Sequence, residues 1–199
     1  MNEKLTKNFA LEELVLSETA ERDDELLQQQ RNPPQEVIDH LRYLCHTTLQ
    51  PIRDKLEFPI HITSGYRSPA VNKAVRGSPT SQHCFGQAVD CTLSSRFLSD
   101  PGSKAVRQEI EEGVETHTGK SIRESVNANF YLFAYVCLHL GELDIDQVIH
   151  EYGLGYGKPA WVHISASEGK NKRQIVALGH YVPRDKRIQD LGTALEFGV

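Results

Sequence analysis

The sequence has no long hydrophobic run, no paired cysteine motif and no stripe of basic residues. No stretch is long enough to span a bilayer. The four cysteines lie far apart without a CxxC pair, which argues against a zinc ribbon or a disulfide framework and favours reduced, mostly buried thiols. The formal net charge is −5, with acidic and basic residues interspersed. Binding to nucleic acid or to an anionic membrane surface is therefore not expected.

The N-terminus lacks the pattern of a signal peptide. Acidic residues interrupt the apolar residues of segment 1–14 before a hydrophobic core could form. As the sequence is written, we expect a cytoplasmic protein. The length of 199 residues favours one domain over 1–199 with a sizeable core.

Hydrophobic periodicity predicts helices and strands in separate parts of the chain. We expect helices over residues 9–15, 34–52, 69–75, 105–112 and 121–140. We expect strands over residues 58–65, 87–93, 146–152 and 160–165, with 174–181 as a further strand or a cover over the domain. Pro51 predicts a kink or a break in its helix. The class is α+β: a small antiparallel sheet packs against N-terminal helices, with a helical insertion over about 95–140.

Two histidines and one aspartate form a candidate metal site. His83 and Asp90 lie in Ser81-Gln82-His83-Cys84-Phe85-Gly86-Gln87-Ala88-Val89-Asp90, and His163 lies in Trp161-Val162-His163-Ile164-Ser165. If the hairpin of 146–165 pairs and faces the strand of Asp90, the three side chains converge. Two imidazoles and a carboxylate hold Zn²⁺ with one position left for water, which is the arrangement of hydrolytic rather than structural zinc.

Three further side chains complete the candidate site. Glu151 shares the hairpin with His163, and a carboxylate at that position is our candidate general base for attack on a carbonyl. Arg67 is permanently charged and planar, which suits a substrate carboxylate or a developing oxyanion. Ser81 adds a hydroxyl donor. Each residue alone also has an ordinary explanation, such as an exposed strand charge or a surface ion pair.

These motifs, together with Ser64-Gly65-Tyr66-Arg67-Ser68, resemble the zinc D-Ala-D-Ala peptidases, and most closely the branch of bacterial cell-wall carboxypeptidases and phage lysins. The resemblance implies a fold shared with the hedgehog signalling domain and zinc on His83, Asp90 and His163. It implies Arg67 and Ser81 near the substrate's terminal carboxylate, and peptidoglycan stem peptides as substrate. The expected activity is therefore that of a D-Ala-D-Ala carboxypeptidase, or an endopeptidase that cuts cross-links.

One departure from the family pattern leaves alternatives open. Many members carry the catalytic acid three residues before the last histidine, where this chain has Ala160; Glu151 fits a variant with the acid further back. A zinc-bearing module that binds the wall or another protein without turnover is therefore a second hypothesis. A non-haem iron oxygenase also uses two histidines and a carboxylate, but the separation of His83 and Asp90 argues against it.

Overall fold

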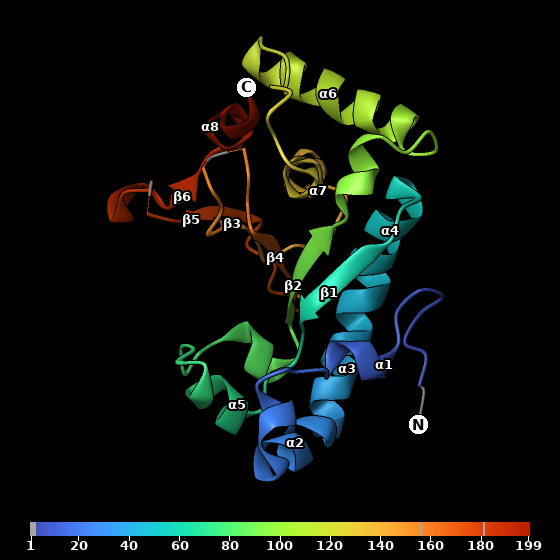
Figure 1. The fold of residues 1–199 in the computed structure, drawn as a ribbon, viewed down its shortest axis with the longest axis vertical. Coiled ribbons are helices and arrows are strands. Elements are labelled where there is room, and N and C mark those ends of the chain that lie inside the picture. Colours follow the sequence, from blue (N-terminus) through green and yellow to red (C-terminus); the bar gives the residue numbers. More distant parts are fainter. Residues whose placement is uncertain (1–2, 156, 181) are drawn as a thin grey trace.

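The computed structural model describes residues 3–155, 157–180 and 182–199 and has the α+β architecture that the sequence predicts. A six-stranded sheet with the order β1-β2-β4-β3-β5-β6 runs through the molecule. Figure 1 shows α6, α7 and α8 at one end of the sheet and α1, α2, α3 and α5 at the other. The strands are β1 (Ile60–Ser64), β2 (Ala88–Leu93), β3 (Gln147–Glu151), β4 (Trp161–Ser165), β5 (Gln174–Leu178) and β6 (Ile188–Gln189).

The N-terminal region is helical. Its helices are α1 (Leu11–Leu14), α2 (Asp24–Arg31), α3 (Gln35–Leu44) and α4 (Gln50–Leu56), followed after β1 by α5 (Pro69–Ala74). Short 3₁₀ segments occupy Ala20–Arg22, Gln82–Phe85, Ser95–Leu98, Arg184–Lys186 and Glu196–Gly198. Helix α2 is absent from the predicted set, and it forms because the Asp23 carboxylate accepts hydrogen bonds from the N–H groups of Glu25 and Leu26.

The chain does not break at Pro51, in contrast to one of the two predicted outcomes. Residues Cys45–Leu49 form a π-helical turn, in which the Gln50 N–H bonds to the carbonyl of Cys45, and α4 then continues to Leu56. The wider turn accommodates a residue that has no N–H to donate, so the irregularity lies just before the proline.

Segment 95–140, which we expected to be a helical insertion, contains α6 (Lys104–Thr118) and α7 (Ala128–Leu138). We expected the second helix to begin at residue 121, but it begins after Asn127, whose side chain accepts from the N–H of Phe130. Nearly every residue of α7 is buried, because the helix packs against β2, β3 and β4 on one side and against α6 and α8 (Leu191–Leu195) on others. No helix of the described residues is both long and apolar enough to cross a bilayer.

The two faces of the sheet have different roles. Alternate residues of the central strands, including Val89, Val148, Val162 and Ile164, join the main cluster of buried apolar side chains on the side of α7. The intervening residues, Asp90 and His163 among them, face the opposite side. The predicted hairpin of β3 and β4 is confirmed. The segment from Gln174 pairs parallel to β3, so the sheet is not wholly antiparallel; Tyr181, the end of that predicted segment, lies outside the described residues.

Candidate metal centre

Strand register places the site residues side by side. Asp90 of β2 lies directly opposite His163 of β4, which lies opposite Ile149 of β3. Directly paired residues share a face, so Asp90 and His163 point to the same side. A register shift between Ile62 and Ser64 of β1 sets Ser64 opposite Asp90. This bulge adds a hydroxyl at the end of the same row.

His83, Asp90 and His163 meet as the sequence predicts. Their ligand atoms all lie within 4.8 Å of one another, and all three residues are buried. Oδ1 of Asp90 lies 3.0 Å from Nδ1 of His163 and 3.3 Å from Nε2 of His83, and the two ring nitrogens lie 3.3 Å apart. His83 reaches the strands from the 3₁₀ turn Gln82–Phe85.

The backbone of Gly65 fixes the orientation of His83. Its carbonyl oxygen lies 2.7 Å from Nδ1 of His83 and accepts the N–H of that nitrogen, so Nε2 is the ring nitrogen that faces the other two candidate ligands. A Cβ at Gly65 would lie 2.2 Å from the carbonyl oxygen of Leu14. Only glycine fits here, because the N-terminal segment passes directly over this turn and the Leu14 carbonyl accepts from the N–H of Tyr66 at 2.7 Å.

Arg67 holds the other oxygen of the aspartate. Its Nη2 donates to Oδ2 of Asp90 at 2.6 Å, and its Nε donates to Oγ of Ser64 at 2.9 Å. The sequence led us to expect this guanidinium at a substrate carboxylate or oxyanion, and gave no sign that it also binds Asp90. Nη1 makes no hydrogen bond with the described residues, and the side chain keeps 21% of its surface exposed.

The surroundings of Asp90 stabilise its charged form. Burial on its own raises the pKa of this carboxyl group, but the hydrogen bonds and charges of His163 and His83 outweigh that effect and hold the pKa well below its ordinary value. The Arg67 contact acts on the same carboxylate. Asp90 is therefore an anion throughout the neutral range, as a metal ligand must be.

Glu151 lies two residues after Ile149 on β3, on the same face of the sheet as Asp90 and His163. It pairs with Trp161, two residues before His163. Burial and the negative charge of Asp90 raise its pKa to about 7, although His163 and Arg67 act in the opposite direction. The indole N–H of Trp161 also favours the charged form of Glu151. Nε1 of Trp161 nevertheless makes no hydrogen bond with the described residues. A carboxylate with such a pKa is suited to exchange protons near neutral pH.

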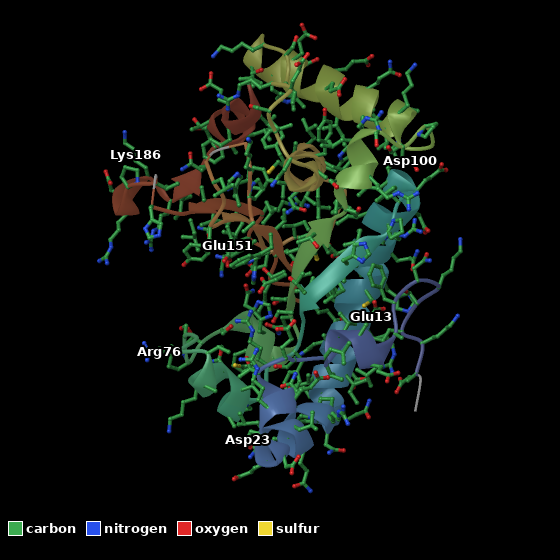
Figure 2. The ribbon with its side chains drawn as sticks, in the orientation of Figure 1. Glu13, Asp23, Arg76, Asp100, Glu151 and Lys186 are labelled. Carbon is green, nitrogen blue, oxygen red and sulfur yellow. The ribbon has the colours of Figure 1, made fainter. Side chains whose placement is uncertain are left out.

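One cleft of about 760 Å³ contains all the predicted site residues. Arg67, Ser81, His83, Asp90, Glu151 and His163 line it, and the hydroxyl of Ser81 makes no hydrogen bond with the described residues. Figure 2 shows Glu151 at the sheet above the α5 region. Sequence reasoning missed two parts of the cleft wall. Segment 16–19 lines the cleft, and so does Tyr152, whose ring centroid lies 5.7 Å from that of Trp161.

The donor set fits a zinc ion. Two imidazole nitrogens and one carboxylate oxygen converge without a thiol, and the His83 proton is held away from the centre by the Gly65 carbonyl. Cys84 is half-buried, and the other three cysteines are buried elsewhere in the core, so none is among the ligands. Three such ligands leave a position for water or substrate in a tetrahedral zinc site.

Comparison with known proteins agrees with this geometry. No curated protein matches the chain. The family model described as peptidase M15 matches residues 7–120, a segment that contains Arg67, Ser81, His83 and Asp90. His163 and Glu151 lie beyond it and are brought to the same cleft by the sheet. The chain belongs to the peptidase M15 family.

Proposed function

We propose that this protein is a zinc-dependent peptidoglycan hydrolase that cleaves a peptide bond next to D-alanine in stem peptides. The observation that carries the proposal is the convergence of three ligand atoms within 4.8 Å, in a cleft that also contains Glu151. His83, Asp90 and His163 would hold the ion. When bound, Zn²⁺ supplies Lewis-acid polarisation of a carbonyl and lowers the pKa of water to about 7.

Glu151, Arg67 and Ser81 have separate roles in the proposed reaction. Glu151 accepts a proton from the attacking water at its carboxylate and passes it to the nitrogen of the leaving amine. In the metal-free protein, burial and the charge of Asp90 raise the pKa of Glu151 and favour the protonated form that donates to the amine, while bound zinc would favour the carboxylate form that accepts from water. Arg67 keeps Asp90 in place through Oδ2, and its free Nη1 and the Ser81 hydroxyl are available to the substrate.

Release of D-alanine tests this proposal. Zinc-loaded protein is incubated with a peptide that ends in D-Ala-D-Ala and, separately, with cross-linked muropeptides. Free D-alanine from the first substrate indicates a carboxypeptidase, and cut cross-links from the second indicate an endopeptidase. Glu151→Gln should retain zinc and lose cleavage by about 10²-fold or more. Full activity of that variant reassigns the base.

A zinc-bearing binding module is the competing reading, because Ala160 stands where many relatives carry the acid. The same incubation separates the two functions. Retention of muropeptides on immobilised zinc-loaded protein without any release of products contradicts the enzyme and favours the module. Metal analysis of the purified protein distinguishes zinc from iron.

A further inference from the structure

Arg76 occupies a backbone position that normally belongs to glycine. Helix α5 ends at Ala74, and the N–H of Gly77 bonds to the carbonyl of Asn72 while the N–H of Arg76 bonds to that of Lys73. These two bonds define a Schellman motif, whose left-handed residue is most often glycine. Here that residue is Arg76, with φ of +57°, and the glycine comes one position later.

The fold itself does not call for an arginine there. The left-handed conformation is unfavourable for a residue with a Cβ. A cation near the helix C-terminus is favourable, but Lys73 already supplies one in the last turn. Arg76 is exposed and makes no side-chain hydrogen bond or ion pair with the described residues. A side chain kept at a strained position without a structural contact is a reason to look for a binding role.

Its position supplies such a role, because Arg76 lines the cleft of the metal centre. Glu151 belongs to the sheet and Arg76 follows α5, and Figure 2 shows Arg76 below Glu151 in this view. The described charged side chains along the cleft, besides the histidines, are Glu18, Arg67, Arg76, Asp90 and Glu151. Since Arg67 is engaged with Asp90, Arg76 is the cation of this set that has no anionic partner.

We propose that Arg76 binds a free carboxylate of the peptide substrate and so determines specificity. This inference rests on the proposed function of the cleft, but not on Arg67 as the carboxylate receptor. A guanidinium recognises a carboxylate through two parallel charge-assisted hydrogen bonds. The group is the terminal carboxylate of the stem peptide or an acidic side chain within it, since both present the same chemistry.

Binding to a protein that does not turn over tests the role directly. Zinc-loaded Glu151→Gln protein is titrated by calorimetry with acetylated Lys-D-Ala-D-Ala as the free acid and as the C-terminal amide. A second pair of amidated peptides carries Glu or Gln in place of Lys. In one of the two pairs, Arg76→Gly should weaken binding of the peptide that carries the carboxylate by about tenfold or more. Binding of the neutral peptide of that pair should stay unchanged. Arg76→Lys should retain part of the preference.

The chain offers a matched control. Arg173 is also exposed, also has a positive φ, of +56°, and does not line the cleft. Arg173→Gly therefore removes the same charge and the same backbone strain, and it should leave all four affinities unchanged. The proposal is wrong if Arg76→Gly leaves the acid preference of both pairs intact, or if Arg173→Gly abolishes it equally.

Kinetics of the protein with Glu151 restored give a second measurement. Arg76→Gly should raise KM for the acidic peptide with little change in kcat, because the contact is remote from the reacting bond. Absence of cleavage in the wild type contradicts the proposed function alone, since the binding titrations still decide whether Arg76 recognises a carboxylate.

Discussion

Nη2 of Arg67 lies 2.6 Å from Oδ2 of Asp90, on the carboxylate oxygen that does not face the two imidazoles. One oxygen is thus left for a metal ion and the other is held by a permanent cation. Such a contact fixes the rotation of the ligand, and the loss of comparable contacts costs metal sites about 10–100-fold in affinity.

Replacement of Arg67 should therefore weaken metal binding. We expect Arg67→Ala to lower zinc affinity by at least about tenfold, because Asp90 loses the partner of Oδ2. Competition with a chromophoric chelator measures this affinity. Arg96→Ala, at an exposed arginine outside the cleft, is the control and should bind zinc as the wild type does. Unchanged zinc affinity in Arg67→Ala would show that Ser64 and the two histidines suffice to orient Asp90.

Gly65→Ala should disturb both the fold and the metal centre. The added methyl group would lie 2.2 Å from the Leu14 carbonyl oxygen, so the backbone has to shift, and overpacking of this kind costs about 1–3 kcal/mol. The shift moves the carbonyl that orients His83, and zinc affinity should fall with stability. Urea unfolding and the chelator assay measure the two effects. At Gly141 a Cβ meets nothing within 4 Å, so Gly141→Ala should change neither.

The pKa of Glu151 has a consequence for stability that needs no metal. Burial and the charge of Asp90 raise this pKa from 4.5 to about 7 in the folded protein. Because the folded state holds the proton more tightly, the contribution of Glu151 to the free energy of unfolding is greatest at low pH and declines as the pH rises from about 4.5 to about 7. Urea unfolding of the metal-free wild type and of Glu151→Gln should show the variant gaining relative stability across this window. A constant difference between the two would place the pKa of Glu151 near its ordinary value.

Bound zinc should lower the pKa of Glu151, in contrast to the effect of burial. A cation bound by His83, Asp90 and His163 favours the carboxylate form of Glu151, so its pKa falls when metal binds. Cleavage requires that form to accept a proton, and kcat/KM should therefore decline on the acidic side of the shifted pKa. Carboxyl ¹³C NMR titrations of the protein with and without zinc measure the shift. An identical pKa in both states would place Glu151 outside the field of the ion.

The sequence predicted that the candidate site residues of the hairpin would share one face, because their spacing follows from local geometry. Alternation along β4 places Trp161 and His163 on one face, and the pairing of β3 with β4 brings Glu151 beside them. The ion pair of Arg67 with Asp90 escaped prediction, because it depends on the register shift in β1 and on packing between segments distant in sequence. The place of β5 beside β3 was also open, since parallel pairing leaves no turn signature between the two strands.

Gln30 illustrates the kind of residue that sequence cannot reveal. It reads as one of three adjacent glutamines, yet it is fully buried. Its Nε2 donates to the carbonyls of Val15 and Tyr66 at 2.9 and 2.6 Å, and its Oε1 accepts from the N–H of Ser68 at 2.8 Å. The Gln30 amide therefore hydrogen-bonds to the residues on either side of Arg67 and connects them to Val15, which precedes segment 16–19 of the cleft wall.

Gln30→Leu should destabilise the protein by about 2–4 kcal/mol, because three buried backbone groups lose their partner and a buried unsatisfied group costs about 1–3 kcal/mol. Gln29→Leu, at the exposed neighbour in α2, should change the free energy of unfolding by less than about 0.5 kcal/mol. Urea unfolding compares the two. Since the lost contacts bracket Arg67, zinc affinity of the folded Gln30→Leu protein should fall as it does in Arg67→Ala. A stability loss with full zinc affinity would mean that Gln30 supports the fold but does not position Arg67.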